Sequence, residues 1–157
     1  PYLELEGTYL VPPGSPLQRI GEVDREGVRI GVTANSAYDL FLGRRLKHAR
    51  LVRFATTPIA IDQLVPQKLD AVAAVRTALI PGARHIPGSR VLDGHFMTIP
   101  QAAAVPKSRS AALRYVANFI EEMKASGFIA AALKRHGLGP DDAIIAPAAA
   151  ATPDAPN

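Results

Sequence analysis

Three apolar segments of strand length alternate with amphipathic segments in the first half of the chain. Residues 28–33, 49–54 and 70–75 predict strands with few polar interruptions, and residues 36–47 and 57–66 show helical spacing between them. Strands that are apolar on both sides need cover on both faces. We therefore expect an α/β fold in which a mostly parallel sheet is flanked by helices and joined by right-handed crossovers.

The rest of the chain departs from this rhythm. Residues 2–11 alternate and predict a strand, whereas residues 17–20 predict a short helix. Pro81-Gly82 and Pro87-Gly88 indicate loops. After Lys107 a long helix is predicted, with one apolar stripe made of Leu113, Val116, Ile120 and Met123.

Both ends carry expectations of their own. The tail, residues 139–157, is rich in Ala and Pro, so we expect it to be disordered because it cannot bury enough apolar surface. The chain begins at Pro1 inside a strand-like segment, which suggests that sequence upstream of it is missing.

Composition narrows the function. The net charge is +4, but the basic residues are dispersed and do not alternate with aromatic ones, so we expect no nucleic-acid partner. The absence of cysteine excludes disulfides, thiolate metal sites and cysteine nucleophiles. The four histidines are not spaced as metal ligands, and no nucleotide-binding or nucleophile motif occurs, so we expect neither a cofactor nor an enzyme.

The best candidate site follows the first buried strand. Asn35, Ser36 and Ala37 stand where this strand gives way to a helix, and free N–H groups at a helix start favour a carboxylate or phosphate. Arg76 follows the third buried strand and could clamp the same anion. Two alternatives stay open. Asn35 or Ser36 only caps the helix, and Arg76 is only a surface charge.

Four segments, in this order, resemble the periplasmic solute-binding proteins of polar-amino-acid ABC transporters: residues 27–32, 35–36, 69–72 and 103–107. The helix ending at residues 124–127 is also similar. The resemblance implies the type II periplasmic binding fold, in which two lobes joined by two crossing strands trap the solute between them.

The same resemblance divides the chain. Residues 1–11 look like a crossing strand and residues 12–100 like the second, ligand-binding lobe. Residues 101–138 look like the return strand and the C-terminal helices that pack on the first lobe, followed by the tail at 139–157. Most of the first lobe is then absent from this chain.

The resemblance also implies site residues. The family's carboxylate-binding Gly-Thr falls on Asn35-Ser36, and Gln101, at the start of the return strand, becomes a candidate ligand contact. The family's acidic residue, which holds the α-amino group of the solute, falls on Val75. Because valine cannot hold an ammonium group, a carboxylate without that group becomes a plausible solute.

We therefore expect a periplasmic binding domain that captures a small carboxylate or amino-acid-like solute for the membrane permease of an ABC transporter. The unpartnered apolar stripe favours self-association of the chain. The alternatives are an enzyme on the same fold that resembles cyclohexadienyl dehydratase, and a sensor or interaction domain without a solute.

Overall fold

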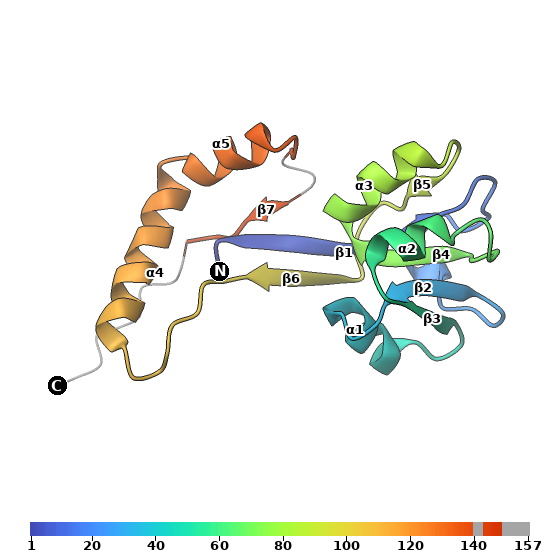
Figure 1. Ribbon diagram of the computed structural model, residues 1–157, viewed down its shortest axis with the longest axis horizontal. Coiled ribbons are helices and arrows are strands. Elements are labelled where there is room, and N and C mark those ends of the chain that lie inside the picture. Colours follow the sequence, from blue (N-terminus) through green and yellow to red (C-terminus); the bar gives the residue numbers. More distant parts are fainter. Residues whose placement is uncertain (140–142, 149–157) are drawn as a thin grey trace. The chain divides into compact units, whose positions relative to one another are not determined.

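The computed structural model describes residues 1–139 and 143–148, which fall into two compact units. The sheet unit is Leu5–Ile99, and the helical unit comprises Pro1–Glu4 and Pro100–Asn157. The chain passes between the units within two paired strands, β1 (Leu3–Val11) and β6 (Met97–Gln101), as Figure 1 shows.

Three parallel strands form the centre of the sheet unit. They are β2 (Arg29–Thr33), β3 (Arg50–Phe54) and β4 (Ala71–Val75), with β2 in the middle. Ile30 of β2 is the register partner of Leu51 on one side and of Ala71 on the other. The predicted parallel sheet is confirmed, with strand bounds within one residue of those expected.

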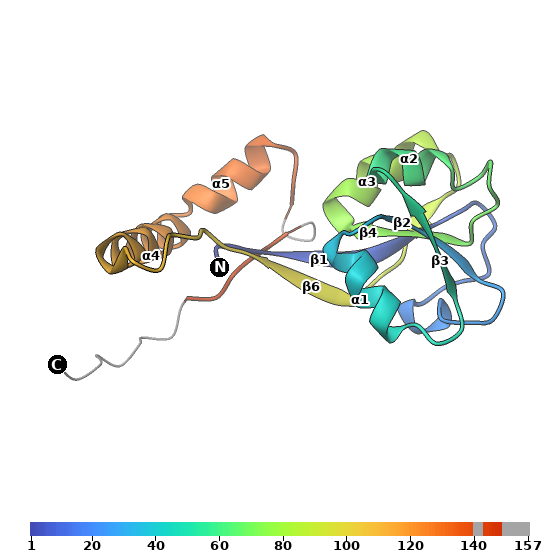
Figure 2. The ribbon, with the colours of Figure 1, turned by 60° about the horizontal axis from the view of Figure 1, so that its bottom comes forward.

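Helices cover both faces of these strands. Helix α1 (Ala37–Arg45) follows β2, α2 (Thr57–Asp62) follows β3, and α3 (Arg76–His85) follows β4. Helices α2 and α3 lie side by side, and α1 lies on the opposite face (Figures 1 and 2). The core between these layers is aliphatic, and its fully buried side chains include Leu10, Ile30, Leu42, Leu64, Leu69 and Leu79.

Strand β1 makes the sheet mixed, because it runs antiparallel to β4 with Gly7 opposite Val75 and Leu10 opposite Val72. The short β5 (Arg90–Val91) pairs antiparallel with β1 on its other side, giving the order β3-β2-β4-β1-β5. The expectation of a mostly parallel sheet thus describes the three central strands and not β1.

One predicted loop is a helix. Pro81 and Gly82 lie inside α3, where Pro81 forfeits one backbone hydrogen bond. Packing explains why the helix persists: Leu79 is fully buried, and a Cβ at Gly82 would lie 2.7 Å from the Ile61 side chain of α2. Gly82 therefore lets the two helices approach closely. The short helix expected at residues 17–20 is not formed there. Instead, a 3-10 turn spans Ile20–Glu22.

The helical unit contains α4 (Ser110–Ala125) and α5 (Phe128–Arg135), separated by Gly127 at a φ of 75°. Positive φ is a conformation that glycine adopts without steric penalty. Among the described residues no helix is long and apolar enough to cross a membrane.

The predicted disordered tail is wrong for residues 143–148. Strand β7 (Ile144–Ile145) pairs antiparallel with Leu3 and Glu4 of β1, and Ala143 and Ala146 are buried. Two small buried side chains and a free strand edge are enough to hold a short segment. The rest of the tail, residues 140–142 and 149–157, lies outside the described residues.

Replacing Gly31 at the centre of the sheet tests this packing. A Cβ there would lie 3.0 Å from Leu69, 3.2 Å from Phe54 and 3.2 Å from Val72, on three sides at once. Gly31→Ala should therefore lower the free energy of unfolding by about 1–3 kcal/mol, as overpacking does. Urea unfolding followed by circular dichroism measures this change.

The matched control is Gly43→Ala in α1. Its Cβ would meet only ordinary contacts, at 3.8 and 3.9 Å, and alanine favours a helix by up to about 1 kcal/mol. Gly43→Ala should therefore keep or raise stability. Equal effects of the two substitutions would contradict the described packing around Gly31.

Candidate functional site

Helix α1 starts at the carboxyl edge of the parallel strands, directly after β2 ends at Thr33. Ser36 precedes the helix, and its hydroxyl accepts from the Asp39 N–H at 3.1 Å and donates to the Thr33 carbonyl at 2.7 Å. The N–H groups of Ala37 and Tyr38 in the first turn have no carbonyl partner within the helix. With the helix dipole they create a positive potential suited to an anion.

An ion pair between the buried Asp39 and the half-exposed Arg53 supports the loop before α1. The Asp39 side chain accepts the Asn35 N–H at 2.9 Å, and Arg53 Nε of β3 lies 3.0 Å from Asp39 Oδ1. Asn35 has a φ of 60°, a left-handed conformation that asparagine tolerates better than most residues. Because Arg53 offsets the charge of Asp39, the helix start is not neutralised by its own carboxylate.

Three hydroxyl groups meet beside this helix start. Thr57 Oγ1 lies 2.8 Å from Thr33 Oγ1 and 2.8 Å from the Tyr38 hydroxyl, so β2, α1 and α2 each contribute one group. From the sequence, Thr57 predicted only a helix start before Pro58. The missed signal is that Thr33 ends a strand and Thr57 begins a helix, which places both at the same edge of a parallel sheet.

Arg76, the first residue of α3, is engaged by β1 and by the segment after β5. Its Nε lies 3.0 Å from Glu6 Oε2, and its Nη2 donates to the Gly94 carbonyl at 2.7 Å. The other oxygen of Glu6 lies 2.9 Å from His95 Nδ1. The remaining nitrogen, Nη1, makes only a long contact of 3.5 Å with the Leu92 carbonyl.

The structure thus brings Asn35, Ser36 and Ala37 together at one helix start. Within the described residues no hydrogen bond joins Arg76 to that start, since Arg76 binds Glu6 and backbone carbonyls instead. Gln101 belongs to the helical unit, where its carbonyl accepts the Tyr2 N–H. Binding of one solute by Asn35, Ser36, Ala37, Arg76 and Gln101 remains a prediction.

A metal centre finds no support in residues 1–139 and 143–148, where no group of three or more His, Asp and Glu side chains gathers. The chemistry at the sheet edge is that of hydrogen-bond donors and hydroxyl groups. Such a set has the groups needed to hydrogen-bond a polar solute, and no carboxylate or imidazole contacts the three hydroxyl groups in the described structure.

Comparison with solved structures identifies the fold of this chain. No protein-family model and no curated protein sequence matches the chain. The solute receptor for L-cysteine of Neisseria gonorrhoeae superposes with a TM-score of 0.74 and 21% identity, over 94% of this chain and 62% of its own. An ABC-transporter binding component from Wolinella succinogenes, solved with lysine, gives a TM-score of 0.76 and 17% identity, over 86% and 60%.

The chain has the fold of the periplasmic amino-acid-binding proteins. An ancestral amino-acid-binding protein, described as a precursor of cyclohexadienyl dehydratase, also shares it, with a TM-score of 0.71 and 20% identity over 86% of this chain and 59% of its own. This chain therefore spans about 60% of the length of these binding proteins.

The helical unit of this periplasmic-binding fold carries an open apolar hollow of about 630 Å³. Neither α4 nor α5 buries a single residue, although both helices are strongly amphipathic. The hollow is lined mainly by aliphatic and aromatic side chains, including Tyr2, Val116, Phe119, Ile120, Met123 and Phe128. Three of the four residues of the predicted stripe line it, and Leu113 is not among them.

Removal of the Asp39 carboxylate tests the support of the α1 start. Asp39→Ala leaves the Asn35 N–H and the half-exposed Arg53 without their partner, so the free energy of unfolding should fall by about 1–3 kcal/mol. Chemical unfolding measures this loss. Asp62→Ala, which removes an exposed carboxylate from α2, is the control and should change stability by less than about 0.5 kcal/mol. Similar losses in both variants would contradict the structural role of Asp39.

Proposed function

We propose that this chain is the ligand-binding part of a periplasmic solute-binding protein, which captures a small carboxylate-bearing solute for the membrane permease of an ABC transporter. The observation that carries the proposal is the start of α1. There the N–H groups of Ala37 and Tyr38 are free of helix partners, beside the hydroxyls of Thr33, Thr57 and Tyr38.

Position supports this assignment. In open α/β sheets, ligands bind beyond the carboxyl ends of the strands, which is where α1 and α2 begin. The proteins of the same fold include a receptor for L-cysteine and a binding component solved with lysine. An amino-acid-like solute with its carboxylate at the start of α1 is consistent with both.

In this proposal Asn35, Ser36 and Ala37 surround the carboxylate, and Ser36 keeps the loop closed through its two hydrogen bonds. Arg76 offers Nη1, its least engaged nitrogen, while Glu6 binds Nε and the Gly94 carbonyl binds Nη2.

Val75 narrows the solute class. It ends β4 opposite Gly7 and is only partly buried, and it offers no charge to an α-ammonium group. We therefore propose that the preferred solute is a carboxylate without that group.

Calorimetric titration of the full chain tests the proposal with two matched pairs of probes. L-cysteine is compared with 3-mercaptopropionate, and L-lysine with 6-aminohexanoate, since each second compound lacks only the α-amino group. We expect the deaminated acids to bind at least as tightly. Much tighter binding of the α-amino acids would refute the conclusion drawn from Val75.

Two substitutions locate the site. Arg76→Ala should weaken binding of 3-mercaptopropionate by about ten- to a hundredfold, the value of one charge-assisted hydrogen bond. Ser36→Ala should weaken it less, because the backbone donors remain. The control is Arg84→Ala, which removes an exposed arginine from the same helix. Unchanged affinity in a folded Arg76→Ala variant would remove Arg76 from the site, and binding of none of the four probes would favour a domain without a solute.

The second candidate function is an enzyme, favoured by the likeness to a precursor of cyclohexadienyl dehydratase. A dehydratase needs a positioned acid, and the carboxylate next to Arg76 is that of Glu6, which Arg76 and His95 both engage. We propose binding without turnover. Consumption of prephenate that is lost in Glu6→Gln would establish the enzyme instead.

We also propose that the apolar hollow of the helical unit promotes self-association of this chain, because neither α4 nor α5 buries a residue in the described structure while apolar side chains of both line the hollow. Light scattering should show species larger than the 16.7 kDa chain. Phe119→Ala should shift the equilibrium toward monomer, since Phe119 lines the hollow. Tyr115→Ala is the control, because Tyr115 is on the same helix, 74% exposed, and outside the hollow lining. A monomer at all concentrations would contradict the proposal.

A further inference from the structure

The positive charge of the chain is concentrated in one stretch of the sheet unit. Residues 24–53 contain seven Arg and Lys and three Asp and Glu, an excess of four. The whole chain has a net charge of +4, so the remaining residues balance one another. The dispersed pattern seen along the sequence therefore hides a local excess.

The acidic residues in this stretch are largely committed to internal contacts. Asp39 is buried against Arg53. The Asp24 carboxylate accepts the backbone N–H groups of Lys47, His48 and Ala49 at 2.8–3.2 Å. Burial acts to raise the pKa of Asp24, but these three N–H groups and the nearby His48 outweigh it and hold the pKa below its usual value.

A hollow of about 710 Å³ lies at the amino ends of β2 and β3. Four of the residues that line it are basic: Arg29, Lys47, His48 and Arg50. Glu26 is the single acidic residue in the lining. We call these four residues the basic face. Arg29 and Arg50 are register partners on adjacent strands, an arrangement that disfavours folding because like charges lie side by side.

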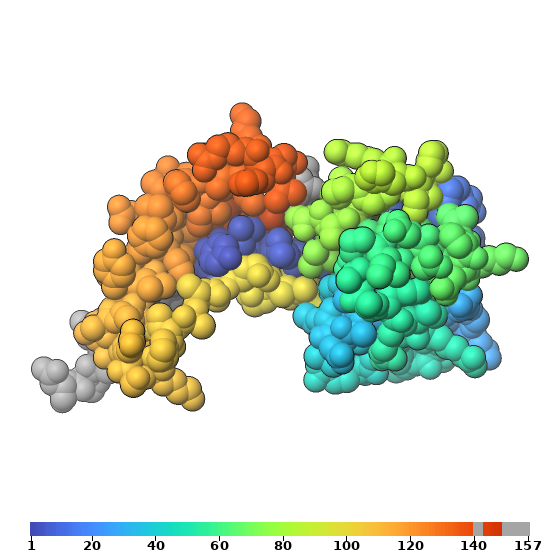
Figure 3. All heavy atoms as spheres, in the orientation of Figure 1, coloured from blue at the N-terminus to red at the C-terminus, as the bar shows by residue number. Residues whose placement is uncertain are grey.

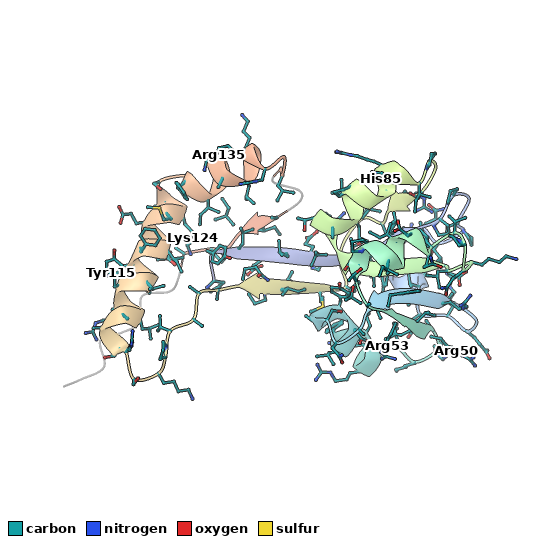
Figure 4. The ribbon with its side chains drawn as sticks, in the orientation of Figure 1. Arg50, Arg53, His85, Tyr115, Lys124 and Arg135 are labelled. Atoms are coloured by element: carbon teal, nitrogen blue, oxygen red, sulfur yellow. The ribbon has the colours of Figure 1, made fainter. Side chains whose placement is uncertain are left out.

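The basic face lies at the opposite end of the parallel strands from the start of α1. Figure 4 shows Arg50, a member of the basic face, well away from His85 on α3. In the space-filling view residues 37–54, cyan to teal, form a continuous surface there (Figure 3). Lys47, His48 and Arg50 are exposed on it, and Arg29 is half-buried, with Nη1 donating to the Gln67 carbonyl.

We propose that the basic face binds the phosphate groups of an anionic phospholipid surface. Basic residues near such a surface each add attraction without requiring a shaped partner. A protein partner would call for a mainly apolar centre, whereas five of the eight lining residues are ionisable and Leu51 and Val52 are the large apolar ones. Single-stranded nucleic acid would call for several stacking rings, and among the described lining residues His48 alone carries a ring. The inference stands independently of the solute site, which uses the other end of the strands.

Sedimentation of the full chain with vesicles tests the inference. Vesicles of phosphatidylcholine with 30% phosphatidylglycerol should bind the chain at 0.05 M salt, and pure phosphatidylcholine vesicles should not. Binding should be lost near 1 M salt, where the screening length falls to about 3 Å. The double variant Lys47→Gln/Arg50→Gln should bind ~25-fold more weakly, about fivefold for each removed charge.

The matched control is Arg84→Gln/Arg114→Gln, which lowers the net charge equally at two exposed positions outside the basic face. It should retain most of the binding. Arg50→Gln should also keep or raise the melting temperature, because Arg29 no longer faces a like charge, so loss of binding is separable from unfolding.

Three results would overturn the proposal: equal weakening in the control pair, no binding of the wild-type chain to the phosphatidylglycerol vesicles, or tighter binding to a 20-nucleotide single strand or to polyglutamate than to those vesicles. Equal weakening in the control pair would mean that net charge alone explains the binding. Tighter binding to the single strand or to polyglutamate would assign the basic face to another class of partner.

Discussion

Parallel pairing of three buried strands is the constraint on which the sheet unit depends. β2 is bonded on both sides and apolar on both faces, so helices must cover both faces of the sheet. Each crossover then returns the chain to the amino ends of the strands before the next parallel strand begins. As a consequence, α1, α2 and α3 each start where a parallel strand ends, and Thr57 of α2 meets Thr33 and Tyr38 there.

Charge at this edge is balanced by pairs that come from distant parts of the chain. Arg53 on the edge strand neutralises Asp39 at the start of α1, and Glu6 on β1 holds Arg76 at the start of α3. The first pair leaves the α1 dipole available for a solute. The second fixes Arg76 to the strand by which the chain enters the sheet unit, and His95 ties the same carboxylate to the segment before β6.

The two ends of the parallel strands therefore have different chemistry. Hydroxyl groups and helix N–H donors occur at the carboxyl ends, and the basic side chains of Arg29, Lys47 and Arg50 occur at the amino ends. The proposed solute site and the proposed phospholipid-binding face can therefore be tested by separate substitutions. The helical unit presents a third kind of surface, an apolar hollow that neither of its helices covers.

Local pattern alone determined the three central strands, the starts of α1 and α2 and the Asn35–Ser36 segment before α1, because apolar runs and capping residues are signals that neighbouring residues carry. Helix α3 needed tertiary structure: Pro81-Gly82 reads as a break, and only the Ile61 side chain beside Gly82 shows why the helix continues. The same holds for β7, which forms because β1 offers it an edge. The contacts of Arg76 with Glu6 and of Thr57 with Thr33 and Tyr38 join residues 19 to 70 positions apart. No local pattern encodes such pairs, since they depend on which strands become neighbours and at what register.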